Sequence, residues 1–228
     1  MKIVSISDLH GRIPKDNVPE CDVLTISGDT CPTYNHELWF QRQWLESEFN
    51  DWLKKQPAKH IVGIAGNLDW VFQDILEKGS PEVKLSWTYL CDSGIVIDGV
   101  KFWGHPWSPM FCQWAFMKYN LNGKGELYEK SLTIPDDVNV LIIHSPPFGI
   151  LDTVEGTDTL VNGKIVREYL GNKPLKKRIN ELKNLKLCVF GHIHSAHGRK
   201  VIGDTTFINA LLLNEDYELV YEFEESVI

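Results

Sequence analysis

The sequence has no long apolar run and no basic leader. No hydrophobic segment of its 228 residues approaches the roughly 20 apolar residues that are needed to cross a bilayer. The chain enters a strand-like run at Lys2–Ser7 directly, without the basic segment and apolar segment that mark a secretory signal. These absences predict a cytoplasmic protein that does not associate with membranes.

Cysteine is scarce, and its positions do not suggest a zinc site or a disulfide framework. The five cysteines are an odd number with wide spacings, and no C-x-x-C pair occurs. Thiolate zinc sites use closely spaced pairs, and disulfide frameworks use an even number of cysteines. The sequence therefore predicts free thiols in a reducing compartment, where cysteine packs as a small apolar side chain.

Basic residues are outnumbered by acidic ones. The chain has 23 Lys and Arg against 31 Asp and Glu, a formal charge of -8. This balance argues against a broad surface that binds long nucleic acid. A small phosphorylated substrate is compatible with the acidic composition if bound cations hold its phosphate. Because the sequence also has no repeats, low-complexity tracts or linkers, we predict a single domain over residues 1–228.

Apolar runs rich in β-branched residues predict strands that are covered on both faces, as in a layered α/β or α+β domain. The Asp-Gly pair within Ile95–Gly104 predicts a hairpin, and two more strands are expected at Thr205–Ala210 and Glu218–Phe223. Gly149–Lys173 is weakly patterned and is expected to be a long loop. The five central runs are Lys2–Ser7, Asp22–Ser27, His60–Ala65, Asn139–Ile143 and Lys186–Phe190.

Two segments carry apolar residues at helical spacing. The first is Glu37–Lys55, in which Trp39, Trp44 and Trp52 fall on the apolar stripe and are predicted to lie in the core. Pro174 is predicted to open a second helix that runs to Leu185.

Each central run ends next to a side chain that can bind metal. Ligands gather outside the carboxyl ends of strands in open α/β sheets, so residues distant in sequence can converge there. The glycines at positions 11, 28, 66 and 191 fit tight turns beside such a site. The side chains are Asp8 and His10 in "DLHG", Asp29 in "GDT", Asn67 in "GNLD", His144 in "HSPP", and His192 and His194 in "GHIH".

Two carboxylates, one amide and four imidazoles form an oxygen and nitrogen ligand set. We expect such a set to bind Mn²⁺, with Zn²⁺, Fe or Ni²⁺ as alternatives, and it is poorly suited to Ca²⁺ or Cu(I). Seven ligands exceed what one ion with an open position needs. They suit two divalent ions about 3.5–4 Å apart that share one carboxylate.

These motifs resemble the calcineurin-like metallophosphoesterase superfamily, whose pattern is D-x-H, G-D, G-N-H-[D/E], a histidine at a strand end, and G-H-x-H. Further similarity, in "GHPWSP", "HSPPFGILD" and "INA", is to small metallophosphoesterase-domain proteins related to class III cyclic nucleotide phosphodiesterases. The resemblance implies a four-layer α/β/β/α sandwich with two mixed sheets. It also implies that Asp29 bridges two ions, one held by Asp8, His10 and His194 and the other by Asn67, His144 and His192.

One position departs from the family pattern, because "GNH" is here "GNL" and Leu68 replaces the histidine. In relatives that histidine steadies the phosphate and can protonate the leaving oxygen, and leucine can do neither. His105 in "GHPWSP" is the leading candidate to compensate, against the alternative of an ordinary turn histidine. Arg12 is a candidate for a phosphate contact. Asp69 could bind water, but we expect it to cap the following helix.

The expected activity is hydrolysis of a small phosphodiester, a cyclic nucleotide being one candidate, by attack of a metal-bridging hydroxide. Asp29, Asn67, His105 and Arg12 are the candidate catalytic residues. Trp70, Trp107 and Trp114 lie near the motif loops, where a ring could stack on a base. The alternative is a metal-binding interaction module of the same fold, with little activity because of Leu68.

Overall fold

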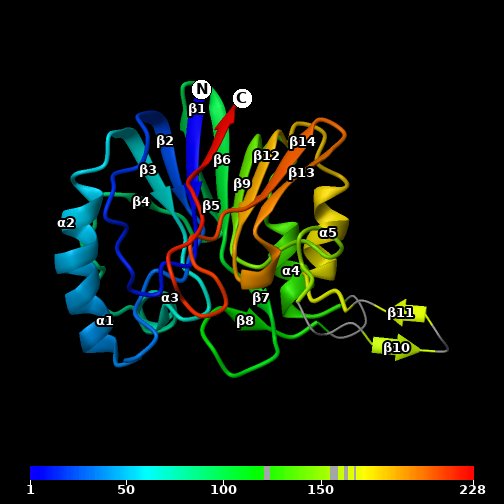
Figure 1. Cartoon of the computed structure of the whole chain (residues 1–228), viewed down its shortest axis with the longest axis horizontal. Helices are drawn as coiled ribbons and strands as arrows, with labels where there is room; N and C mark the ends of the chain where they lie inside the picture. The colour runs from blue at the N-terminus through cyan, green and yellow to red at the C-terminus, as the bar shows by residue number, and fades with distance from the viewer. Residues whose placement is uncertain (121–123, 155–158, 162–163, 167) are drawn as a thin grey trace.

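The buried apolar runs form the centres of two mixed β-sheets in the computed structural model (Figure 1), which describes residues 1–120, 124–154, 159–161, 164–166 and 168–228. The first sheet has the order β15 (Glu224–Val227), β1 (Lys2–Ile6), β2 (Cys21–Ile26), β3 (Ala58–Gly63) and β4 (Thr88–Tyr89). The second has the order β13 (Gly198–Ile202), β14 (Thr205–Asn209), β12 (Leu187–Phe190), β9 (Val140–Ile143), β6 (Val100–His105) and β5 (Ser93–Ile97).

Parallel strands make up the interior of both sheets, and antiparallel strands lie at edges. Strands β1 to β4 pair in parallel, and β15 pairs with β1 antiparallel. In the second sheet β6, β9, β12 and β14 are parallel, with β5 and β13 antiparallel at the two edges. The expected pair of mixed sheets is therefore confirmed.

Helices cover the outer face of each sheet (Figure 1). Beside the first sheet lie α1 (Leu38–Trp44), a π-helical turn (Leu45–Phe49), α2 (Asn50–Leu53) and α3 (Trp70–Lys78). Beside the second lie α4 (Glu126–Leu132) and α5 (Lys173–Ile179). The arrangement is a four-layer α/β/β/α sandwich. The remaining elements are β7 (Ser108–Pro109), β8 (Met117–Lys118), β10 (Thr159–Val161), β11 (Lys164–Val166) and a 3₁₀ turn (His194–Ala196).

Alternation along the strands divides the buried side chains among three apolar layers. Ile3 packs between the two sheets with Val140 and Val189, whereas Val4 faces the helical layer that contains Trp44. A third cluster joins the second sheet to α5. Each fully buried aliphatic side chain contributes roughly 1.5–3 kcal/mol to the stability of the fold. The layer between the sheets therefore fixes the position of the strand ends of one sheet relative to those of the other.

Several expectations about the elements need correction. Trp44 and Trp52 are buried as predicted, but Trp39 is 63% exposed because it lies in the first turn of α1, facing away from the sheet. The C-terminal strand forms at Glu224–Val227 rather than Glu218–Phe223, because the free edge of β1 pairs with the later segment.

The predicted loop Gly149–Lys173 contains two short paired strands, β10 and β11, although part of it lies outside the described residues. The helix at Pro174 begins one residue earlier, at Lys173, and ends at Ile179 rather than Leu185. The Asn172 side chain accepts a hydrogen bond from the Leu175 N–H, which caps its start.

The hairpin prediction is confirmed. Strands β5 and β6 pair antiparallel and are connected by Asp98 and Gly99, which both have the positive φ of a tight hairpin turn. All five cysteines are free thiols, as expected. Over the described ranges, no helix combines the length and the apolar character needed to cross a membrane.

Candidate metal centre

The carboxyl ends of five parallel strands place the seven predicted ligands at one edge of the sandwich. Asp8 follows β1, Asp29 follows β2 and Asn67 follows β3 in the first sheet. In the second sheet His144 follows β9, while His192 and His194 follow β12. Loops of the two sheets bond directly to one another, for example through the N–H of His192 and Oδ2 of Asp8, 2.9 Å apart. The core between the sheets thus brings both halves of the predicted site together.

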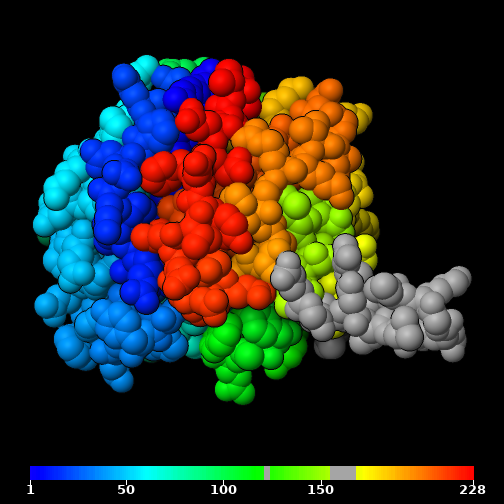
Figure 2. Space-filling view, in the orientation of Figure 1, coloured from blue at the N-terminus to red at the C-terminus, as the bar shows by residue number. Residues whose placement is uncertain are grey.

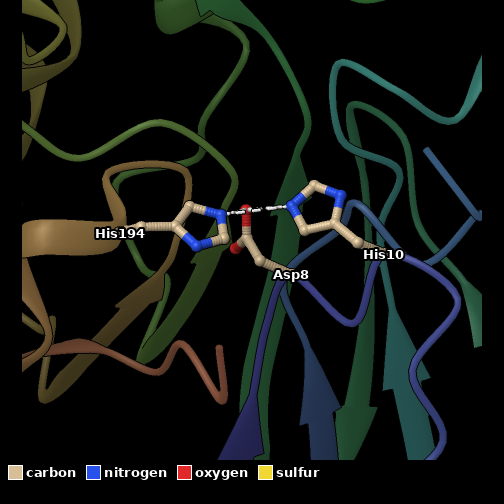
Figure 3. Close-up of side chains that lie close together, drawn as sticks. All are labelled: Asp8, His10 and His194. Carbon is tan, nitrogen blue, oxygen red and sulfur yellow. Dashed lines mark hydrogen bonds and ion pairs between the residues drawn. The ribbon is translucent and has the colours of Figure 1, made fainter. Parts of the chain in front are cut away.

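Asp8, His10 and His194 form the first group (Figure 3). The Nε2 atoms of His10 and His194 are 3.2 Å apart. Asp8 Oδ1 lies 3.6 Å from the first of these nitrogens and 3.7 Å from the second. This oxygen is buried and has no hydrogen-bond partner among the described residues. One ion fits such a cluster, because a 2.0–2.1 Å metal–nitrogen bond places two cis ligands roughly 3 Å apart.

The second group is centred on Asp29 and His144, again with Asp8 nearby. His144 donates from Nδ1 to the carbonyl of Ser27 at 2.9 Å, which leaves Nε2 as the ligand atom. Nε2 lies 2.8 Å from Asn67 Oδ1 and 3.5 Å from Asp29 Oδ2. A neutral ring nitrogen and an amide oxygen both carry lone pairs, so their close approach fits a shared cation or proton.

His192 lies beside the second group without entering it directly. Its ring centroid is 4.9 Å from that of His144, and its backbone N–H donates to Asp8 Oδ2 at 2.9 Å. Burial and the neighbouring charge of His144 lower the pKa of His192 to about 4. The imidazole is therefore neutral at physiological pH, as a metal ligand must be.

The two groups share a carboxylate, and the structure offers two candidates for it. Asp8 belongs to both groups. Asp29 Oδ2 faces both as well, at 3.5 Å from His144 Nε2 and 3.9 Å from His10 Nε2. The bridging role that the resemblance implies for Asp29 is compatible with this placement and stays a prediction.

The backbone at the site is strained. Asp8, His10, Asp29 and His192 all have positive φ, between 47° and 71°, a region that costs non-glycine residues free energy and is concentrated at functional sites. Close packing accompanies the strain, because a Cβ on Gly191 would lie 1.8 Å from Asp8 Oδ2. Only glycine fits there.

Opposing charges set the protonation of the buried ligands. Burial opposes ionisation of Asp8 and Asp29, but hydrogen bonds and charges from the surrounding histidines outweigh it and lower the pKa of both carboxyls. Burial also opposes protonation of His144, yet Asp29 and Asp8 raise its pKa to about 9. The two buried carboxylates are thus held ionised, and divalent cations would take the place of the histidine protons that balance them.

Asp69 does not cap α3 as expected. It occupies the residue before the helix, but its side chain makes no capping bond. Instead the carboxylate accepts hydrogen bonds from the N–H groups of Gly66, Cys31 and Thr30 and from the Thr30 hydroxyl, at 2.8–3.3 Å. At the start of α3 it is Gln41 Oε1 that accepts a hydrogen bond from the Val71 N–H, at 3.0 Å, which leaves Asp69 for the buried donors of the two ligand-bearing loops. Asp69 therefore joins the loops of Asp29 and Asn67.

The structure does not place the other two catalytic candidates at the ligands. His105 is fully buried and contacts Asp92, with Nδ1 3.3 Å from Oδ1. The same carboxylate accepts a bond from Trp107. Arg12 is exposed and does not line the pocket described below. Catalytic roles for His105 and Arg12 remain predictions that no contact supports.

A cavity of about 570 Å³ opens over the ligands. His10, Asp29, Asn67, His192 and His194 form part of its lining, and Leu68 lies among them. Of the three tryptophans considered for stacking, only Trp114 lines this cavity. Sequence reasoning missed Phe111, Tyr169, Glu215 and Tyr217, which also line it. Only Phe111 among these four could have been found from the sequence, because it closely follows the motif "GHPWSP".

Comparisons with known proteins agree with this geometry. The family model described as "Calcineurin-like phosphoesterase" matches residues 1–196. The chain is 32% identical to the human "Metallophosphoesterase domain-containing protein 1" over 96% of this chain and 68% of that protein. It is 30% identical to a UPF0046 protein of Caenorhabditis elegans over 96% of this chain and 72% of that one.

A solved structure aligns with a TM-score of 0.59 at 15% identity, covering 91% of this chain and 89% of the other, which supports the fold alone. The family match spans every strand end that carries a predicted ligand. The chain belongs to the calcineurin-like phosphoesterase family.

Proposed function

We propose that this protein is a metal-dependent phosphodiesterase acting on a small phosphodiester, with cyclic nucleotides among the candidate substrates. The family consists generally of metal-dependent hydrolases. The observation that carries the proposal is the unpartnered, buried Asp8 oxygen beside the Nε2 atoms of His10 and His194, under an open cavity.

The chain's own residues define what the site would do. Asp8, His10 and His194 would hold one cation, Asn67, His144 and His192 the other, with Asp29 between them. When bound, two divalent cations lower the pKa of water toward neutrality and screen the charge of a phosphoryl group.

Two backbone carbonyls orient the histidines. Ser27 accepts from His144 Nδ1 and Asn214 accepts from His194 Nδ1, each at 2.9 Å. Both bonds leave Nε2 directed at the ligand cluster, which fixes the tautomer that binding requires.

Leu68 shapes the substrate preference. Its backbone N–H donates to Asp29 Oδ1 at 2.7 Å, so the loop keeps its form, but its side chain offers the leaving group no proton. General acid assistance is typically worth about 10²–10⁴-fold. Diesters with good leaving groups depend on it least, which favours them over alkyl monoesters.

The test is hydrolysis of bis(4-nitrophenyl) phosphate in Mn²⁺. We expect turnover that chelation removes and that Asp29→Ala or His144→Ala abolishes. His36→Ala is a matched control, because His36 is an exposed histidine outside the cavity lining. Full occupancy by two ions with no turnover of any phosphoester would refute the proposal.

A second candidate function rests on the same leucine. With Leu68 in the cavity wall, the fold can serve as a metal-bearing interaction module with little activity. A Leu68→His variant that gains activity from an inactive parent supports this candidate. An active parent whose rate Leu68→His leaves unchanged removes it.

A further inference from the structure

Exposed aromatic side chains line the cavity over the ligands, and besides Tyr169, which is 46% exposed, three of them contact ligand histidines or each other. Phe111 is 58% exposed, Trp114 38% and Tyr217 40%, and all three line the cavity over the ligands. Large exposed aromatic groups that gather in a concave site mark a binding surface rather than a packing defect.

The rings contact three of the predicted ligand histidines, which lie on different sides of the cluster. Phe111 lies against His192, with 5.6 Å between ring centroids, and meets Trp114 edge-on at 5.2 Å. Tyr217 lies against His10 at 4.9 Å and His194 at 5.2 Å. A phosphate held at the ligand cluster would therefore have an aromatic surface on either flank.

The turn that carries Tyr217 is preorganised. Asn214 Oδ1 accepts from the N–H groups of Asp216 and Glu218, at 3.0 and 2.9 Å, and Leu213 bridges to Leu219. Tyr217 itself has a φ of 58°. The backbone that carries the ring is thus ordered before a ligand arrives, which lowers the entropic cost of binding.

This turn lies beyond residues 1–196, which the family model matches. The red C-terminal segment runs down the middle of the face shown in Figure 2 and comes next to the green segment below it. The cavity joins the two segments, since both Tyr217 and Phe111 line it.

The charge of the wall adds to the argument. Leu68, Pro109, Met110 and Ile193 extend the apolar lining, and among the described lining residues none is Lys or Arg. Such a wall suits an uncharged planar group better than additional phosphates.

We propose that Phe111, Trp114 and Tyr217 form a subsite for a planar aromatic group attached to the phosphate, so that the substrate class is aryl or nucleoside phosphodiesters. This inference rests on the proposed function for its phosphate but not for its ring. A concave wall of this size fits a small molecule rather than a protein surface.

Three phosphonic acids test the subsite without any turnover, because their carbon–phosphorus bond is not a phosphoester. Phenyl-, cyclohexyl- and methylphosphonic acid are titrated calorimetrically into the Mn²⁺-loaded protein. We expect the phenyl compound to bind roughly tenfold or more tightly than the methyl compound, because base–aromatic stacking is worth about 1–3 kcal/mol per ring. The cyclohexyl compound should fall well short of it.

The variants Phe111→Leu and Tyr217→Leu should each erase most of the phenyl preference while metal stoichiometry stays unchanged. Tyr217→Phe keeps the ring and should keep the preference. Tyr119→Leu is the matched control, since Tyr119 is 59% exposed and does not line the cavity. Equal binding of phenyl and methyl compounds, or of phenyl and cyclohexyl compounds, overturns the subsite.

The two proposals fail separately. A phenyl preference without hydrolysis of any diester refutes the phosphodiesterase and supports the subsite. Hydrolysis of bis(4-nitrophenyl) phosphate with a KM that Phe111→Leu and Tyr217→Leu leave unaltered supports the phosphodiesterase and refutes the subsite.

Discussion

Replacing Asp69 by asparagine should loosen the metal centre without touching any ligand. The side chain is fully buried, and each of its oxygens accepts two hydrogen bonds from the loops of Asp29 and Asn67. Asparagine has only one carbonyl oxygen, so its amide nitrogen must face two donors. Hydrogen bonds to a charged acceptor are worth roughly 1.5–3 kcal/mol, and losing two would cost about 3–6 kcal/mol.

An opposing effect reduces this cost. Burial and the charge of Asp29 raise the pKa of Asp69, so its ionised form is held at some expense. Asparagine removes that repulsion, and we expect a net loss of about 2–4 kcal/mol. For a chain of this size each kcal/mol shifts Tm by about 2–4 °C. The predicted decrease in Tm is therefore roughly 5–15 °C.

Thermal unfolding in a chelator measures the stability change, and Mn²⁺ titration measures the effect on the site. Because displaced supporting groups typically weaken metal binding about 10–100-fold, affinity should fall along with Tm. Asp74→Asn is the control, since Asp74 lies in α3 and bonds to Lys78 and Ser80 at the surface. An Asp69→Asn protein with parental Tm and Mn²⁺ affinity would refute the reasoning.

Two further predictions concern the histidines. Asn214→Ala removes the side-chain oxygen that orders the turn, so the Asn214 backbone carbonyl should no longer be held in position to orient His194. Calorimetry should then show one Mn²⁺ site weakened about 10–100-fold, whereas the control Asn180→Ala, at an exposed position, should leave both sites unchanged. Two unchanged sites in Asn214→Ala would contradict this prediction. In a chelator, Tm should decrease as pH rises from 6.5 to about 9, because the folded state holds the His144 proton more tightly than the unfolded state. The Mn²⁺ affinity should instead increase with pH, since ligands must lose protons. A flat Tm profile, or the same slope in His144→Ala, would count against the second prediction.

Local patterns were sufficient to predict the strands that carry ligands and the order of those ligands. Continuous apolar runs signal strands covered on both faces, and each ends within a few residues of its ligand, so β1, β2, β3, β9 and β12 were found with small errors at their ends. The same local information misplaced the last strand. Whether residues 218–223 or 224–227 pair with β1 depends on which segment reaches that edge, and in the structure it is residues 224–227.

The roles of single polar residues were harder to predict, because they depend on partners distant in sequence. Asp69 resembles a helix cap in its own segment, yet its donors come from Thr30 and Cys31 as well as Gly66. His105 contacts Asp92, which lies 13 positions away in sequence, and its catalytic role stays a prediction.

Sequence alone determined the family and the set of candidate ligands, because metal chemistry restricts which residue types can follow a strand end and the motifs record that restriction. Only the tertiary structure decided how the two sheets meet, that Asp8 and Asp29 both face the two ligand groups, and that Phe111 and Tyr217 flank the site. These depend on packing between residues about a hundred positions apart, which leaves no periodic or local signature in the chain.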